Sequence, residues 1–390
     1  MRRSHLVLLA LSVSAFVVGT AEYIIAGLLP QVASDLHISV GAAGQAVTAY
    51  ALGVVIGGPI VTILTVRLPR KGLALGLMAL FAAGSAVCAL APSYEILLAG
   101  RVMSSLSHAA FLALSLVVAV SAVPAERAGR AMAFVISGMT VATLLGVPLG
   151  TLLGQQAGWR APFAVLVVLA GAGIVLLALT LPRQPATVTD LRREIGVLAR
   201  RPVIMAIVTT AVGYSGVAAV FTYIAPMLTE ITGFAPPVVS ALLLAYGMGS
   251  VLGNLAAGRL TDRFPSATLR GVFGSLTVLL VLTPFAVLWK PAAVPAVLAL
   301  GLLATATITP LQGIILRHAG EAPMLAVSVN VGAFNLAIAF GSVVAGVIVA
   351  GGGLRWTGLA GAVLSALGLG LSYLAVPRRT AHPAAAVPAT

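Results

Sequence analysis

One carboxyl group of this 390-residue chain stands apart from the others. Glu22 lies well inside an apolar stretch, whereas the other eight acidic residues fall in polar links or near the ends of apolar stretches. An ionised carboxylate is costly in a medium of low dielectric constant, so such a group is usually functional or paired with a cation. The position of Glu22 predicts reversible protonation, with a buried ion pair that holds helices together as the alternative.

Arg101 and His108 are the candidate neighbours of this carboxyl group. Glu22 lies seven residues before the expected end of the first apolar stretch, at 29. Arg101 lies six residues after the expected start of the fourth apolar stretch, at 95. Both then lie about 9 to 10 Å below one surface at a helical rise of 1.5 Å per residue. A nearby guanidinium stabilises an ionised carboxylate, so a change in the separation of the two groups is predicted to switch protonation. His108 follows Arg101 by two helical turns on the same face, and is either a cavity residue or a hydrogen-bonded packing residue.

The composition indicates that most of the chain lies within a lipid bilayer. Hydrophobic residues make up 60% of the sequence and charged residues 8%, whereas soluble domains carry about 25% charged residues. Twelve apolar stretches are long enough to cross a bilayer as helices. They cover residues 5–29, 43–66, 72–91, 95–122, 131–154 and 161–181, and then 203–228, 237–258, 268–288, 294–316, 325–350 and 356–376. The sequence therefore predicts an all-α membrane protein with 12 transmembrane helices.

Basic residues gather in alternate links between these stretches. The links on one side hold Arg67, Arg70, Lys71, Arg127, Arg130, Arg183, Arg192, Arg193, Arg200, Arg201, Arg259, Arg263, Arg270, Arg317, Arg378 and Arg379. The opposite links hold only Arg160, Lys290 and Arg355. By the positive-inside rule, both termini are predicted to be cytoplasmic in a multi-pass protein of the cell (inner or plasma) membrane. Short basic clusters without a continuous basic face exclude a nucleic-acid-binding protein.

The chain is predicted to contain two pseudo-symmetric six-helix bundles, 1–181 and 203–377. A shift of 196 residues aligns Gly53 with Gly249 and Gly57 with Gly253, among other identities, which indicates a duplication. Between the bundles, 182–202 has prolines and an apolar stripe at helical spacing, typical of a linker helix on the cytoplasmic membrane surface. The segment 378–390 is predicted to be a disordered cytoplasmic tail.

Several motifs resemble those of a known family. The run Gly258-Arg-Leu-Thr-Asp262-Arg263 resembles the loop signature Gly-x-Leu-x-Asp-Arg of the major facilitator superfamily. Similarity to its twelve-helix drug:proton antiporter branch, which includes chloramphenicol- and arabinose-type exporters, lies in Gly19-Thr-Ala-Glu22-Tyr23, in 101–111, in 146–150, in 158–160 and in 330–335. The resemblance covers nearly the whole chain. It implies alternating access and proton-coupled efflux of a small, hydrophobic, drug-like compound, such as a chloramphenicol-like antibiotic.

The same resemblance implies gating elements. The first-half copy of the loop motif keeps Arg67 and Arg70 but has Val66 at the acidic position, so a charge-paired gate would depend on Asp262 beside Arg263. In a second motif, Gly146, Pro148 and Gly150 are expected to form a bending or sealing element. Plain helix packing explains these glycines equally well, and the two interpretations are compatible.

Aromatic and amide side chains inside the stretches are candidates to line a substrate cavity, because binding pockets combine apolar walls with a few polar anchors. They are Tyr23, His108, Tyr214, Phe221, Tyr223, Asn330 and Asn335. Tyr50 and Tyr246 are further candidates, with packing that repeats in the two halves as the alternative. A tyrosine near a helix end is more often an interfacial anchor. The two asparagines, fully polar within one stretch, are therefore the stronger candidates.

Enzyme chemistry finds little support in the sequence. The five histidines form no metal-ligand cluster, and neither a Gly-x-Ser-x-Gly elbow nor a phosphate-binding loop is present. We therefore expect no metal or cofactor, a proton gradient as the energy source, and a monomer whose partners are a small-molecule substrate, protons and the lipid bilayer. Export of a sugar, a nucleoside or another metabolite stays open, as does a lipid flippase, and a non-transporting sensor or an intramembrane enzyme is a more remote alternative.

Overall fold

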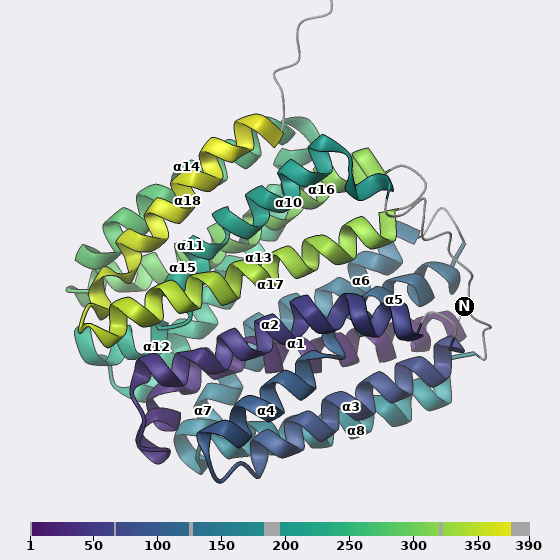
Figure 1. The fold of residues 1–390 in the computed structure, drawn as a ribbon, viewed down its shortest axis with the longest axis horizontal. Helices are drawn as coiled ribbons and strands as arrows, with labels where there is room; N and C mark the ends of the chain where they lie inside the picture. The colour runs from purple at the N-terminus through teal and green to yellow at the C-terminus, as the bar shows by residue number, and fades with distance from the viewer. Residues whose placement is uncertain (1, 66–67, 125–127, 183–195, 320–322, 376–390) are drawn as a thin grey trace, which may run out of the picture.

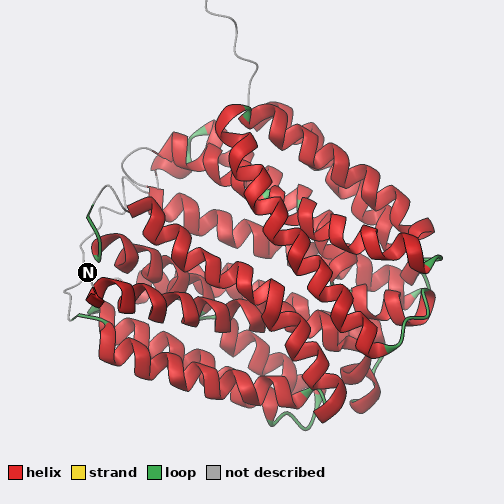
Figure 2. Ribbon diagram, turned by 180° about the vertical axis from the view of Figure 1, so that it is seen from behind, coloured by secondary structure: helices red, strands yellow, loops and turns green. Residues whose placement is uncertain are grey.

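The protein is helical throughout the parts that are described. The computed structural model describes residues 2–65, 68–124, 128–182, 196–319 and 323–375. These ranges contain helices, turns and short loops and no strand, as Figure 2 shows. Twelve helical segments within them are long and apolar enough to cross a membrane. The predicted number of transmembrane helices is therefore confirmed.

The first six spans are built from eight α-helices. They are α1 (Arg2–Asp35), α2 (Val40–Thr65), α3 (Arg70–Ala89), α4 (Tyr94–Ser105) with α5 (His108–Ser121), α6 (Ala128–Val141) with a π-helical turn η2 (Ala142–Gly146) and α7 (Val147–Ala157), and α8 (Arg160–Thr180). The first helix continues past Pro30 to Asp35, six residues beyond the predicted end at 29. An internal proline is tolerated in a transmembrane helix because neighbouring helices and local adjustments satisfy the freed backbone groups.

The second six spans repeat this plan with interruptions in their first member. They are α10 (Arg201–Gly213) with α11 (Ser215–Phe221), α12 (Ile224–Pro226) and the π-helical turn η3 (Met227–Ile231), then α13 (Pro236–Arg263), α14 (Pro265–Ala286), α15 (Lys290–Ala306) with α16 (Ile308–Ala319), α17 (Pro323–Ala350), and the 3-10 turn η4 (Leu354–Trp356) with α18 (Thr357–Ala375). Of the predicted linker helix, 183–195 lie outside the described residues and 196–198 are helical. The predicted tail at 378–390 also lies outside them.

Serine side chains explain why the fourth span is broken between α4 and α5. The hydroxyls of Ser104, Ser105 and Ser107 donate to the backbone carbonyls three residues earlier, at distances of 3.1, 2.7 and 2.9 Å. Such local bonds compete with the regular helical ladder and bend the chain. The break separates the helix that carries Arg101 from the helix that begins at His108.

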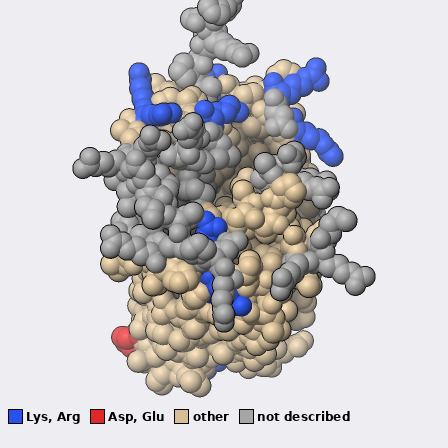
Figure 3. Space-filling view, turned by 90° about the vertical axis from the view of Figure 1, so that its right-hand side faces the viewer, with Lys and Arg blue, Asp and Glu red and all other residues tan. Residues whose placement is uncertain are grey.

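The two halves lie side by side with their spans running roughly parallel. In Figure 1 the helices of the first half, purple to blue, occupy the lower part and those of the second half, green to yellow, the upper part. At the boundary, α2 packs against α17, and η2 with α7 packs against α13. Figure 3 looks onto the end of the molecule where the N-terminus lies, and Lys and Arg side chains are spread over that end.

Candidate functional site

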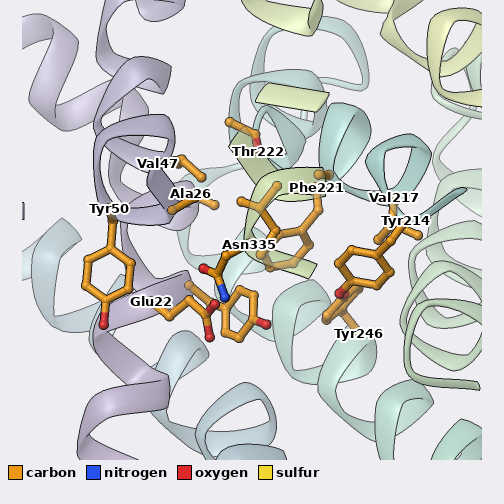
Figure 4. Close-up of a pocket in the computed structure, with 14 residues that line it drawn as sticks. Glu22, Ala26, Val47, Tyr50, Tyr214, Val217, Phe221, Thr222, Tyr246 and Asn335 are labelled. Carbon is orange, nitrogen blue, oxygen red and sulfur yellow. The ribbon is translucent and has the colours of Figure 1, made fainter. Parts of the chain in front are cut away.

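A narrow cavity lies between the two halves, about midway along the spans. Its walls come from α1 and α2 in one half and from α11, α13 and α17 in the other, with Tyr214 at the junction of α10 and α11 (Figure 4). The lining residues are Glu22, Tyr23, Ala26, Val47, Tyr50, Ala51, Tyr214, Val217, Ala218, Phe221, Thr222, Tyr246, Asn335 and Ile338. The cavity volume is about 20 Å³, enough for about one water molecule.

Glu22 supplies the single carboxyl group among the lining residues. Its side chain is 6% exposed, and the side chains of Tyr23 and Asn335 lie within hydrogen-bonding reach of it. Figure 4 shows the Asn335 amide nitrogen turned toward the Glu22 carboxyl group. Because Glu22 belongs to α1 and Asn335 to α17, this contact joins the two halves at the cavity.

Arg101 lies at the level of Glu22, but its N–H groups are directed at backbone carbonyls. Nε donates to the carbonyl of Ala46 at 3.2 Å, Nη1 to that of Ala21 at 2.5 Å, and Nη2 to that of Glu22 itself at 3.2 Å. The guanidinium carbon lies 4.2 Å from the centre of the Tyr50 ring, a cation–π contact. Arg101 thus ties α4 to α1 and α2, and its charge acts on Glu22 from nearby. Among the described residues, the salt bridge present joins Arg160 to Asp35 at the helix ends.

His108 lies behind Tyr50 rather than in the cavity wall. Its Nδ1 is 3.1 Å from the Tyr50 hydroxyl, and the two rings meet edge to face with centroids 5.8 Å apart. The side chain is buried. This arrangement is that of a hydrogen-bonded packing residue, the second of the two interpretations left open by the sequence.

The structure brings together four of the seven candidate cavity residues: Tyr23, Tyr214, Phe221 and Asn335. Asn330 lies elsewhere and joins three helices, because its Oδ1 accepts from the Thr210 hydroxyl at 2.9 Å and its Nδ2 donates to Gln312 at 2.9 Å. Tyr50 and Tyr246, which stand at equivalent places in the two halves and for which packing was the alternative, also line the cavity.

Comparison with known proteins assigns a family to this architecture. The family model described as the Major Facilitator Superfamily matches residues 11–325, most of the chain. The chain belongs to the major facilitator superfamily. It is therefore a multi-pass membrane transporter of small molecules and not an enzyme.

Relatives within the superfamily span almost the same length. The uncharacterized MFS-type transporter YtbD of Bacillus subtilis (strain 168) is 39% identical over 363 residues, 92% of each chain. The chloramphenicol resistance protein of Streptomyces lividans is 39% identical over 348 residues, 87% of this chain and 88% of its own. A bacterial homolog of the human lysosomal transporter Spinster, solved in an inward-facing and unoccupied conformation, superposes with a TM-score of 0.71 at 16% identity, over 96% of this chain and 97% of its own. At that identity the likeness concerns the fold alone.

In this superfamily member, Tyr223 is not among the residues that line the cavity and lies between the halves, toward one end of their interface. Its buried hydroxyl lies 3.3 Å from the carbonyl oxygen of Gly41 and 3.5 Å from that of Ser342. The Ser342 hydroxyl donates in turn to the carbonyl of Gly44 at 3.1 Å. The end that contains α12, on the left of Figure 1, is therefore closed by contacts between α2 and the second half.

The glycines of the fifth span form a close contact with the helix that carries Glu22. A Cβ atom on Gly146 would overlap the side chain of Thr20, and one on Gly150 would overlap Ile24. Pro148 between them is buried, and the π-helical turn η2 ends at Gly146. These residues let the fifth span pack closely against α1, so a bend in this span would shift α1.

The predicted loop gate is described only in part. Arg67 lies outside the described ranges, and the side chain of Asp262 is not among those described either. Arg70 Nη1 lies 3.4 Å from the Ser121 hydroxyl, which connects α3 to the end of α5. The Arg263 guanidinium stacks over the Phe264 ring at 5.3 Å. Within the described part of the chain, no group of three or more His, Cys, Asp or Glu residues could hold a metal ion.

Proposed function

We propose that this transporter exports a small, hydrophobic, drug-like compound in exchange for protons. The observation that carries the proposal is the place of Glu22, a buried carboxyl group at the cavity where the two halves meet. Ionisable residues inside a membrane mark proton and substrate pathways. The similarity to a chloramphenicol resistance protein supports efflux of a chloramphenicol-like antibiotic.

The small size of the cavity supports alternating access. A drug-sized ligand needs a pocket of about 300 to 1,000 Å³, far more than the space now present, so the halves must move apart for cargo to enter. When the end sealed by Tyr223 opens, Glu22 takes up a proton from outside and cargo leaves. When the opposite end opens, Glu22 releases the proton inward and fresh cargo binds.

The walls of the cavity favour an uncharged cargo with a flat apolar part. The rings of Tyr23 and Phe221 meet edge to face with their centroids 6.0 Å apart, and the ring centroids of Phe221 and Tyr246 are 4.5 Å apart. Aromatic walls bind apolar rings through large contact areas. A single carboxyl group that also carries the transported proton is a poor permanent partner for a strongly cationic cargo, and the nearby Arg101 charge opposes a cation further.

We further propose that the end with the N-terminus faces the cytoplasm of a cell with this protein in its inner or plasma membrane. Lys and Arg side chains spread over that end, in keeping with the positive-inside rule. The working unit of the proposal is a monomer, driven by the proton gradient without a cofactor. The loop residues Arg67, Arg70, Asp262 and Arg263 would lie on the cytoplasmic side and gate it.

Proton flux into liposomes tests this function. The full chain is reconstituted with a pH-sensitive dye inside the vesicles, and flux is measured on addition of chloramphenicol, arabinose or a nucleoside. Wild-type protein is expected to give chloramphenicol-dependent flux, which Glu22→Gln abolishes because the amide cannot take up the proton. Glu95→Gln is the matched control, since Glu95 is exposed at the start of α4.

The outcomes separate the alternatives. Equal flux in wild type and Glu22→Gln would refute proton coupling through Glu22. Flux that depends on arabinose or the nucleoside instead of chloramphenicol would replace drug efflux by metabolite export. Absence of flux with every compound would contradict proton-coupled export of this panel and favour a uniporter or a sensor.

A further inference from the structure

Asn335 is the polar side chain from the second half that faces Glu22 across the cavity. It lies on α17 and is 2% exposed. One hydrogen of Nδ2 is used within the helix, where Nδ2 donates to the carbonyl of Val331 at 3.2 Å. The amide also lies within hydrogen-bonding reach of the Glu22 carboxyl group. Nδ2 therefore donates within its own helix and also faces Glu22.

The side-chain oxygen of Asn335, Oδ1, is buried and accepts no hydrogen bond from the described residues. An amide oxygen offers two lone pairs, and a buried acceptor without a partner is unfavourable and uncommon in native structures. Figure 4 shows the amide oxygen on the side turned away from Glu22. Oδ1 is thus an unused acceptor on a residue that lines the central cavity.

The groups around Glu22 and Asn335 do not satisfy this acceptor. Tyr23 on α1 serves Glu22 and lies within reach of Tyr214, next to α11. The Tyr50 hydroxyl on α2 is turned to His108. Tyr246 on α13 packs its ring against Phe221. The N–H groups of Arg101 are directed at carbonyl oxygens. None of these groups donates to Oδ1 among the described residues, so a molecule that enters the cavity, water or cargo, can supply the donor.

We propose that Asn335 selects the cargo by accepting a hydrogen bond at Oδ1 while its Nδ2 stays on Glu22. The cargo class is then a neutral compound with a flat apolar part, which lies against Phe221 and Tyr246, and a hydroxyl or amide N–H group at its edge. A site that uses a buried acceptor discriminates against analogues without the donor, because the acceptor would then stay unpaired. This inference rests on the proposed export function and adds the residue and the donor that select the cargo.

One amide then touches both the cargo and the coupling carboxyl group. Cargo that holds Oδ1 fixes the rotation of the amide, and so fixes Nδ2 against Glu22 from the opposite half. Glu22 and the cargo are thus linked through Asn335. Asn335 is accordingly a specificity-determining residue that also positions the contact between the halves.

Equilibrium binding to the purified full chain in lipid nanodiscs tests the proposal. The probes are radiolabelled chloramphenicol and its derivatives methylated at the amide nitrogen or at the hydroxyl groups, which remove hydrogen-bond donors one type at a time. Wild type is expected to bind at least one methylated derivative about tenfold more weakly than the parent compound, the effect of one lost hydrogen bond. In Asn335→Leu, which has similar size and no acceptor, the two compounds should bind within about twofold of each other.

A second variant separates loss of the acceptor from damage to the fold. Asn335→Asp keeps oxygen acceptors at this position and is expected to retain the preference for the parent compound, although its contact with Glu22 changes. Asn254→Leu is the matched control, since Asn254 is exposed on α13. It should bind all probes like wild type.

The proposal is overturned if wild type binds every methylated derivative as tightly as the parent compound, or if the preference persists in Asn335→Leu. Binding of none of the probes to wild type would overturn the cargo class. Failure of proton coupling is read separately in the flux assay with Glu22→Gln. A protein that shows the Asn335-dependent preference without moving protons would keep this inference and refute antiport.

Discussion

The Ser342 hydroxyl donates a hydrogen bond of 3.1 Å to the carbonyl oxygen of Gly44 and so joins α17 of one half to α2 of the other. Gln155 and Ser240 make a second connection at the same end of the molecule, between α7 and α13. Gln155 also donates to the carbonyl of Pro236 at 2.8 Å. Together with Tyr223, these contacts hold one end of the transporter closed in the described structure.

We expect Tyr223→Phe to open this end more often. The change removes the hydroxyl that lies between Gly41 and Ser342 but keeps the buried ring. A buried hydrogen bond in a membrane protein contributes about 1 kcal/mol, so the open population should rise about fivefold. The measurement is the rate at which an impermeant maleimide labels Val217→Cys, a cavity position, in a Cys88→Ser background.

Two glycine variants accompany this experiment, one as a second test and one as a control. A Cβ on Gly346 would press on the Tyr223 hydroxyl, so Gly346→Ala should increase labelling in the same direction as Tyr223→Phe. Gly76→Ala should not change it, because a Cβ on Gly76 meets no other atom within 4 Å. Labelling that stays at the wild-type rate in both Tyr223→Phe and Gly346→Ala would show that these contacts do not control access.

Gly150→Leu should destabilise the protein through the contact between α7 and α1. The added side chain would overlap Ile24 two residues from Glu22, and overpacking of this kind costs about 1 to 3 kcal/mol. The midpoint of thermal unfolding is expected to fall, together with proton flux. Ile24→Ala in the same chain makes room and should recover at least half of the loss, as coupled neighbours do.

Gly171→Leu is the matched control for this prediction. Gly171 lies on α8, and a Cβ there meets no other atom within 4 Å. Its unfolding midpoint should remain close to that of wild type. If Gly150→Leu also leaves the unfolding midpoint unchanged, the close approach of α7 to α1 does not contribute to the stability of the protein.

Arg101→Lys tests whether Arg101 acts by its charge or by its hydrogen bonds. The planar guanidinium reaches the carbonyls of Ala21, Glu22 and Ala46 at once, and a lysine ammonium cannot reproduce that fork. Loss of charge-assisted bonds should lower the free energy of unfolding by about 2 to 3 kcal/mol. Thermal unfolding and proton flux are measured on the same preparation.

The two readouts distinguish the roles of Arg101. A destabilised variant whose remaining folded fraction shows normal flux would assign Arg101 to holding α4 against α1 and α2. A stable variant without flux would instead show that the exact position of the charge near Glu22 matters for coupling.

Much of the architecture is local information that the sequence contains directly. A span needs about 20 apolar residues in a row, and the predicted number of spans followed from that alone. The 196-residue repeat and the lone acidic residue inside a span are also readable without a structure. Helix ends were less accurate, since the apolar pattern does not tell whether a helix stops at Pro30 or continues to Asp35.

Contacts between helices had to come from the tertiary structure, because they join residues far apart in the chain. Asn330 and Asn335 lie five residues apart on the same helix, and the sequence could not tell their roles apart. Asn335 faces Glu22, whereas Asn330 forms hydrogen bonds with Thr210 and Gln312. Nor could it place Tyr223 at the closed end and Tyr246 in the cavity wall. Hydropathy determines which segments enter the membrane, whereas the rotation and packing of each helix determine which polar side chains meet inside it.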